Sequence, residues 1–297
     1  MTRSGRVAAF SGAALAAGAV VFAGLSARAA ESFLHPVRRS VAPVCPCVAH
    51  VHCGDAMVVS TDGTHLKGWY YEPDQPNGAA VILLHGIGGN REDLVGLGVV
   101  FEKAGYRVLL PDLRGHGTSD GLTTLGVRES DDVHAWADWM LLRSGVNRIY
   151  GFGVSLGGSV LLESLDREKR FRAVVAESAF TTFPDVAVER ISRGLPGPVK
   201  WLAFPFVDTA LLWTRIRYGA DLKTGSPLQS VKRTNVPVLL IHGRDDPKTE
   251  AEHSRKLAAA NRGVTDLWLV PGAGQANSLV TAKVDFDRRV LAWFDSR

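Results

Sequence analysis

Residues 148–158 read RIYGFGVSLGG, and this stretch decides the fold. Its first five residues are mostly apolar and predict a buried strand, and an apolar helical stretch follows over 156–165. Between them lies the pattern G-x-S-x-G, formed by Gly153, Ser155 and Gly157. Between a strand and a helix, this pattern is typical of a nucleophile elbow, a turn that presents a serine hydroxyl above the edge of a sheet.

The elbow predicts Ser155 as the nucleophile of an acyl-transfer reaction. The amide of Leu156 opens the following helix, where partial positive charge favours a negatively charged oxygen. Residues 85–90, HGIGGN, follow another apolar strand, and the amide of Ile87 in this loop is the second expected donor. The sequence therefore predicts an oxyanion hole formed by Ile87 and Leu156. A phosphate site does not fit the loop, because no Lys-Ser/Thr pair follows its glycines.

From residue 56 onward, apolar runs of strand length alternate with helical stretches. This alternation predicts an α/β fold with a mostly parallel central sheet and helices on both faces. A turn at Asp62-Gly63 joins the first two strands, which should add an antiparallel edge. Val280, Val284, Leu291 and Phe294 are spaced to face the sheet from a C-terminal helix. Strands are expected at 57–60, 66–71, 79–84, 107–110, 148–152, 173–176, 238–241 and 267–270, and helices at 91–104, 129–143, 156–165 and 248–260.

One interval breaks this rhythm. Residues 181–235 contain no clear strand but several large apolar side chains, among them Trp201, Phe204 and Trp213. A structureless loop of this length would be unusual in a compact domain. We therefore expect an inserted helical cap over the ligand-binding edge of the sheet, with extra core packing as the alternative. An apolar cap favours an acyl or aromatic ester as the ligand.

The N-terminal segment has the composition of a targeting signal. Arg3 and Arg6 precede an uncharged run over residues 7–25, and Ala27-Arg28-Ala29 follows. This order is typical of a cleaved signal peptide over residues 1–29. The run approaches the length that spans a bilayer, so an N-terminal membrane anchor through residues 7–25 is the alternative. Either interpretation predicts an exported domain, periplasmic or secreted, or one anchored outside the cytoplasm.

Residues 30–55 are expected to form a linker with a Cys/His cluster. The cluster holds Cys45, Cys47 and Cys53 together with two histidines. It comes from one short arm, whereas tetrahedral metal sites usually draw ligands from two separated arms. A disulfide between Cys53 and one of the upstream cysteines is the simpler expectation.

Composition excludes several classes of protein. The chain has 297 residues, of which 46% are hydrophobic and 22% charged, and its net charge is +4. The basic residues are spread along the chain rather than clustered, so we expect no nucleic-acid partner. Three cysteines cannot form a disulfide scaffold for a chain of this length, so a packed core must stabilise it.

Three motifs in chain order resemble those of a known family. HGxGG at 85–89, DxRGHGxS at 112–119 and GxSxG at 153–157 are similar to the motifs of α/β-hydrolases. The resemblance covers roughly residues 56–297 and is nearest to the serine aminopeptidase-like and Bem46-like branches, many of whose members are esterases or lysophospholipases. It implies an α/β-hydrolase fold and a serine hydrolase of ester or thioester bonds in small acyl compounds, with no metal and no organic cofactor.

The resemblance also implies a catalytic acid and a catalytic base. The family's acid occupies the last position of HGxxD, which falls on Asp246, with Asp245 as the near alternative. The family's base is a histidine in a late GxGH loop, but here Gln275 stands at that position and no histidine follows His253. Glutamine forms a hydrogen bond with a serine but cannot take its proton near neutral pH.

Four interpretations of Gln275 remain open at this point. The chain is a catalytically inactive ligand-binding protein on a hydrolase scaffold, or another histidine, with His116 best placed, replaces the base. Alternatively Gln275 is a variant of an active parent, or the substrate supplies its own base. The prediction that we carry forward is a serine hydrolase with an incomplete triad of Ser155, Asp246 and Gln275, whose activity is impaired by the glutamine.

Overall fold

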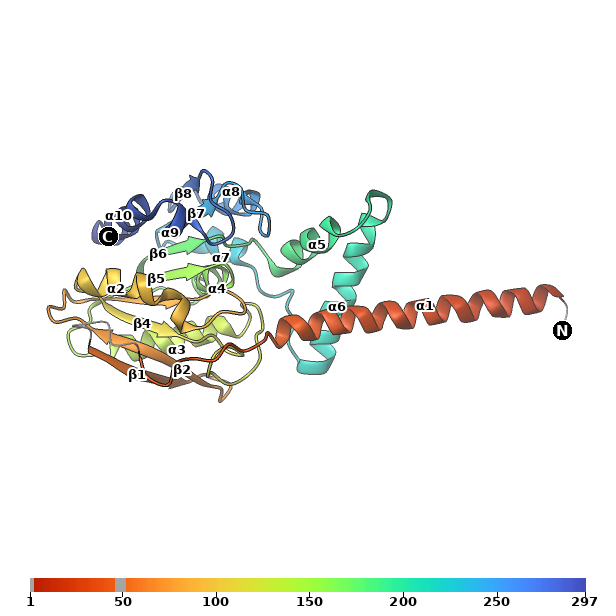
Figure 1. The fold of residues 1–297 in the computed structure, drawn as a ribbon, viewed down its shortest axis with the longest axis horizontal. Coiled ribbons are helices and arrows are strands. Elements are labelled where there is room, and N and C mark those ends of the chain that lie inside the picture. The colour runs from red at the N-terminus through yellow and green to blue at the C-terminus, as the bar shows by residue number, and fades with distance from the viewer. Residues whose placement is uncertain (1–2, 46–51) are drawn as a thin grey trace.

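The computed structural model describes residues 3–45 and 52–297 and contains an eight-stranded sheet in the order β1-β2-β4-β3-β5-β6-β7-β8 (Figure 1). The strands from β4 to β8 run parallel, and β2 pairs antiparallel with both β1 and β4. The strand bounds are β1 His52–Val59, β2 His65–Glu72, β3 Ala79–Leu84, β4 Arg107–Pro111, β5 Arg148–Val154, β6 Phe171–Glu177, β7 Val238–Gly243 and β8 Thr265–Val270. The predicted mostly parallel sheet with an antiparallel edge is therefore confirmed.

Helices cover both faces of this sheet (Figure 1). In β3 the side chains of Ala80 and Ile82 join the core beneath α3, α4, α7 and α8, while Val81 and Leu83 join a second core beneath α2 and α10. Alternate residues of a strand point to opposite faces, which is why a strand between two helical layers is apolar throughout. The helix bounds are α1 Arg3–Leu34, η1 Arg91–Leu94, α2 Val95–Lys103, α3 Glu129–Leu141, α4 Leu156–Ser164, α5 Phe183–Arg193, η2 Gly197–Leu202, α6 Ala203–Tyr218, α7 Pro227–Arg233, α8 Ala251–Ala260, α9 Ser278–Thr281 and α10 Lys283–Asp295.

The segment between β6 and β7 consists of α5, η2, α6 and α7. Helices α5 and α6 stand away from the sheet, whereas α7 returns to it beside α4 and α8 (Figure 1). Thr182 begins α5 by accepting a hydrogen bond from the amide of Asp185, and Ser226 begins α7 by accepting one from Gln229. Each helix thus starts at a side chain that satisfies a free amide of its first turn.

The N-terminal region differs from the expected linker. Helix α1 continues to Leu34, and β1 already begins at His52, so the connecting segment is shorter than residues 30–55. Cys45 and Cys53 form a disulfide that ties this segment to the start of β1. Cys47, another member of the Cys/His cluster, lies outside the described residues. Within residues 3–45 and 52–297, no group of three or more His, Cys, Asp or Glu side chains is placed to hold a metal ion.

The C-terminal helix buries a different face from the one that the sequence predicted. Val280 and Val284 are 75% and 80% exposed rather than packed on the sheet. The helix is interrupted at Ala282 between α9 and α10, so the two helices present different faces to the sheet. The side chains that α10 buries against the sheet are Phe286, Val290, Trp293 and Phe294.

A backbone crossing holds β5 and α4 against β3. A Cβ atom added at Gly157 would lie 2.3 Å from the carbonyl oxygen of Leu84, and one added at Gly153 would lie 2.4 Å from the carbonyl oxygen of Gly157. Real Cβ atoms do not approach other atoms this closely, and backbone atoms cannot swing aside. Glycine at both positions is therefore required by space.

We expect Gly157→Ala to lower the free energy of unfolding by about 1–3 kcal/mol, because the new methyl group overpacks a backbone crossing. Gly96→Ala in α2 is the matched control, since nothing lies within 4 Å of its Cβ position. Alanine should leave that helix as stable or slightly more stable. Urea denaturation of both variants tests this, and equal stability of the two would contradict it.

Candidate active site

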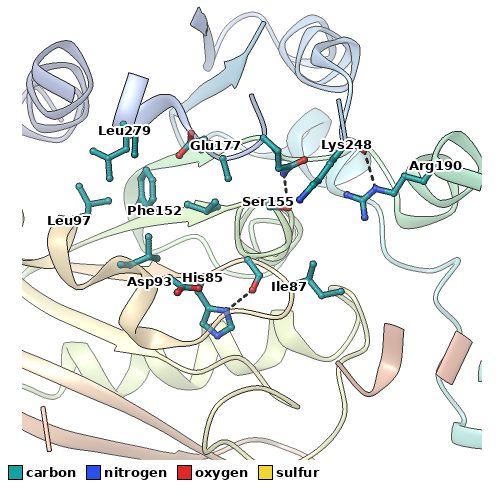
Figure 2. A pocket seen from close by; sticks show the side chains of 16 residues that line it. His85, Ile87, Asp93, Leu97, Phe152, Ser155, Glu177, Arg190, Lys248 and Leu279 are labelled. Carbon is teal, nitrogen blue, oxygen red and sulfur yellow. Dashed lines mark hydrogen bonds between the residues drawn. The ribbon is translucent and has the colours of Figure 1, made fainter. Parts of the chain in front are cut away.

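Ser155 lies at the carboxyl end of β5, directly before α4. Its backbone has φ +52° and ψ −113°, a conformation that residues other than glycine rarely adopt. The amide of Ser155 donates to the carbonyl oxygen of Glu177 at 2.7 Å, and Ser159 N donates to the carbonyl oxygen of Ser155 at 3.0 Å. These bonds and the glycine crossing hold the strained turn, as is common at functional sites. The side chain of Ser155 faces a pocket (Figure 2).

Gln275 connects Ser155 to Asp246. Its side-chain amide lies 3.1 Å from Ser155 Oγ. The two ends of an amide are assigned from their hydrogen-bond partners, and only one orientation satisfies both ends here. In that orientation the amide oxygen accepts from Ser155 Oγ at 3.1 Å, and the amide nitrogen donates to Asp246 Oδ1 at 3.1 Å and to Thr249 Oγ1 at 3.2 Å. The glutamine therefore links the serine hydroxyl to the carboxylate of Asp246.

The loop after β7 separates the two candidate acids. Asp246 is buried, and its Oδ1 accepts from the amides of Lys248 and Thr249 at 2.8 and 2.9 Å. Burial opposes its ionisation, but His242 and the two amides outweigh burial and hold the pKa of Asp246 below its usual value. Asp245 is exposed and accepts from the amide of Gly272. Asp246, not Asp245, is thus the carboxylate beside Gln275.

The two amides predicted for an oxyanion hole belong to the residue after Ser155 and to a loop that lines the same pocket. Leu156 is the first residue of α4, so its N–H has no acceptor within the helix. Ile87 lies in the loop after β3 and lines the same pocket as Ser155 (Figure 2). Gly86 brings this loop against the elbow, because a Cβ there would lie 3.5 Å from the Cβ of Ser155.

Backbone groups bind the rings of His85 and His116, the histidines of the two motif loops. His85 lines the pocket, but its Nδ1 lies 2.7 Å from the carbonyl oxygen of Gly86 and its Nε2 accepts from the amide of Leu113 at 3.0 Å. Burial, with a smaller contribution from His116, lowers the pKa of His85, so the ring is neutral at physiological pH. His116 packs edge-to-face on His85 with ring centroids 5.1 Å apart, and it is not among the pocket-lining residues.

The pocket is polarised from end to end. It has a volume of about 500 Å³. Leu97, Phe152 and Leu279 lie on one side of Ser155 together with the carboxyl groups of Asp93 and Glu177, and Arg190 and Lys248 lie on the other side (Figure 2). One side of the serine therefore suits a hydrocarbon group and the other side suits a negative charge.

Sequence reasoning missed four charged residues of this pocket, namely Asp93, Glu177, Arg190 and Lys248. Arg190 comes from α5 and is fixed by donating to the carbonyl oxygen of Lys248 at 3.1 Å and to Thr249 Oγ1 at 3.3 Å. Glu177 ends β6, accepts from the amide of Ser278 at 2.8 Å, and has its pKa raised by burial. A signal existed for Glu177, since it directly follows the predicted strand 173–176. Nothing in the spacing pointed to Arg190 or Lys248.

The chain is similar to several known proteins. A family model described as the alpha/beta hydrolase fold matches residues 79–205. The chain is 32% identical over 207 residues to the mouse protein named lysophosphatidylserine lipase ABHD12, covering 67% of this chain and 50% of the mouse protein. It is 24% identical over 245 residues to the uncharacterised Bacillus subtilis protein YqkD, covering 81% of this chain and 78% of YqkD. The chain thus spans about half the length of the mouse relative.

Solved structures agree on the fold. The Pyrococcus furiosus esterase Pf2001 superposes with a TM-score of 0.70 at 24% identity, covering 86% of this chain and 96% of the esterase. The ferulic-acid complex of Est1E from Butyrivibrio proteoclasticus superposes with a TM-score of 0.59 at 21% identity, covering 82% of this chain and 100% of Est1E. The predicted α/β-hydrolase fold is therefore confirmed.

We expect Gln275→Glu to destabilise the protein by about 1–3 kcal/mol at pH 7, because it places a second carboxylate against buried Asp246. Repulsion raises the folded-state pKa of the pair above the unfolded value of about 4.3. The penalty is therefore full above the raised pKa and disappears as pH falls through it toward 4. Unfolding free energies at several pH values measure this. Exposed Gln229→Glu is the control, and a pH-independent effect at Gln275 would contradict the amide orientation described here.

Proposed function

The chain belongs to the α/β-hydrolase superfamily, and from this premise we propose that it is a serine hydrolase of esters or thioesters whose turnover is limited by Gln275. The observation that carries the proposal is the continuous hydrogen-bonded chain from Ser155 Oγ through the Gln275 amide to Asp246. These hydrogen bonds keep the hydroxyl of Ser155 directed into the pocket. What it lacks is a group that binds a proton near neutral pH.

In the proposed reaction, Ser155 Oγ attacks the carbonyl carbon of a bound ester, and its proton leaves to solvent hydroxide rather than to a side chain. The amides of Ile87 and Leu156 stabilise the negative oxygen of the tetrahedral intermediate. Collapse of the intermediate expels the alcohol and leaves an acyl group on Ser155, which water then removes. Both steps are slow, because neither the hydroxyl nor the water is activated by a base.

An amphiphilic ester with a negatively charged head is the substrate class that the pocket favours. A hydrocarbon chain would lie along Leu97, Phe152 and Leu279, where burial of apolar surface is favourable. An anionic group would lie beside Arg190 and Lys248. The relative named lysophosphatidylserine lipase bears a name that describes a single-chain ester with an anionic head, which supports the same class.

A second candidate function is a binding protein that holds such a ligand without turning it over. The observation that favours it is that His85, the histidine among the described residues that line the pocket, has no ring nitrogen free to take the proton of Ser155. His85 has both ring nitrogens engaged with backbone, and Gln275 does not titrate. The two candidates differ only in whether an acyl group ever reaches Ser155.

The compartment follows from the N-terminal region. One helix of the described chain, over Leu15–Leu34, is long and apolar enough to cross a membrane by length and composition. We place the hydrolase domain outside the cytoplasm, which is supported by the Cys45–Cys53 disulfide and by Arg3 and Arg6 before the apolar run.

We expect Gln275→His to raise kcat/KM for a nitrophenyl ester by on the order of 10³-fold or more, because loss of one triad member typically reduces turnover by 10⁴–10⁶. The variant should also gain an inflection in its pH–rate profile near the ordinary histidine pKa of about 6.5. The native chain should show only a rise with hydroxide concentration.

The controls for this prediction are Ser155→Ala in both backgrounds, which should remove the gained activity. Equal activity of the native chain and Gln275→His would show that proton transfer runs through another group. No activity in either chain would favour the binding protein.

We expect Arg190→Met and Lys248→Met each to weaken binding of an acyl ester with an anionic head by about 10-fold, while a neutral ester of the same chain length binds as before. Each loses one cation facing the ligand while keeping most of its hydrophobic stem. Equilibrium binding to the Ser155→Ala chain measures this without turnover. Equal loss for both ligands would contradict a head-group role.

A further inference from the structure

We refer to α5, η2 and α6 as the cap, and helix α1 is attached to the cap through α6. Glu31 accepts hydrogen bonds from Trp213 Nε1 at 2.7 Å and from the Tyr218 hydroxyl at 2.6 Å, and both donors belong to α6. The rings of Phe22 and Phe206 meet edge-on with centroids 5.6 Å apart. α6 therefore lies across α1, and the N-terminal part of α1 projects beyond the cap into open space (Figure 1).

The attached part of α1 is folded into the molecule. Ser26 and Ala30 are buried, and Leu34 is wholly buried in the core beneath the sheet. The carbonyl oxygen of Leu34 also accepts from the amide of Thr123 at 3.1 Å. A cut after Ala29 would divide the helix in the middle of these contacts. The arrangement therefore favours α1 as a retained element rather than a removed leader.

Both α1 and the cap expose large apolar side chains. Single exposed apolar residues are ordinary, but a group on two elements in contact marks an interaction surface. On the cap, Leu212 and Ile216 are one turn apart on α6, and Trp201 in η2 and Phe204 at the start of α6 are exposed as well; these four residues are named the cap face. The exposed fractions are 63% for Trp201, 61% for Phe204, 54% for Leu212 and 74% for Ile216, and on α1 they are 76% for Leu15, 72% for Val20, 61% for Val21 and 55% for Leu25.

We propose that the cap face docks on a lipid bilayer that α1 enters. The 19 residues of α1 before Phe22, residues 3–21, extend about 28 Å at 1.5 Å per residue, which is close to the thickness of a hydrocarbon core of about 30 Å. α1 and the cap are joined by Glu31 and the Phe22–Phe206 contact, so insertion of α1 brings α6 to the membrane surface.

Charge and composition favour lipid over a second copy of the chain as the occupant. Arg28 belongs to α1, and Arg215 and Arg217 belong to α6, where Arg215 also lies 3.7 Å from Asp221. Basic side chains on these two helices suit the anionic head groups of a membrane surface. The projecting part of α1 is rich in Ala and Gly, which favour the membrane only weakly. The aromatic and branched side chains of the cap face supply the apolar area that α1 lacks, and Trp at this level suits a membrane interface.

Docking would connect the lipid contact to the pocket, because both involve the segment between β6 and β7. α5 precedes the cap face in the chain, packs against α6, and contributes Arg190 to the pocket. The segment that touches the bilayer is thus the segment that lines the site, and an amphiphile would move from membrane to pocket beneath it.

Depth-dependent fluorescence quenching tests the docking in the full-length chain. A fluorophore is attached to Ile216→Cys in a Cys47→Ser background, with Cys45 and Cys53 left in their disulfide. The protein is reconstituted in phosphatidylcholine vesicles with and without phosphatidylglycerol, and nitroxide-bearing lipids are the quencher. Labels on Val20→Cys and on exposed Ser144→Cys serve as bilayer and solvent controls.

We expect the label at 216 to be quenched several-fold more than the label at 144, and more strongly with phosphatidylglycerol present. Quenching at 20 without quenching at 216 would show that α1 anchors a cap that stands clear of lipid, and it overturns the proposal. Quenching at neither position overturns it as well. Shielding of 216 that depends on protein concentration and not on lipid would identify a second copy as the occupant and equally overturn it.

A second variant separates docking from folding. Leu212→Glu/Ile216→Glu should reduce quenching of a label at Phe204→Cys several-fold while leaving the melting temperature unchanged, because both side chains are exposed. Leu142→Glu, at an exposed site away from the cap, is the matched control and should leave quenching as it was. Equal quenching in both variants would contradict the cap face as the contact.

Discussion

The site depends on a crossing of backbone at the end of β5. Gly153 and Gly157 let the elbow pass within van der Waals distance of β3 and of its own helix, and this forces Ser155 into a positive-φ conformation. The strain is held by parallel strands on both sides and by the hydrogen bond from Ser155 N to the carbonyl oxygen of Glu177. The hydroxyl is therefore placed by the fold itself, whatever residue faces it from the late loop.

Gln275 links Ser155 to Asp246 by hydrogen bonds, but its amide does not titrate near neutral pH. An amide and an imidazole both have one acceptor and one donor on opposite sides, so the glutamine can take the serine's hydrogen bond and pass one on to Asp246. Asp246 is buried, but its partners satisfy its oxygens and hold its pKa low. The difference between the two side chains appears only when a proton must move.

Much of this arrangement was predictable from the sequence because local rules govern it. The alternation of apolar runs predicted the parallel sheet, and the glycines at 153 and 157 predicted a tight turn between strand and helix. Other features depend on packing between distant segments. The loop that carries Lys248 fixes Arg190, and Glu31 binds to α6. Neither contact leaves a periodic signal in the sequence. The break at Ala282 turned Val280 and Val284 outward, because one helix was expected where two form.

The fate of an acyl group delivered to the native chain tests most directly whether Ser155 is a nucleophile. Mass-spectrometric peptide mapping after incubation with a nitrophenyl ester locates that group. If Ser155 attacks but no base activates water, the acyl-enzyme should persist, and the added mass should appear on the peptide that contains Ser155. Unmodified Ser155 with acyl groups only on surface lysines would contradict the account.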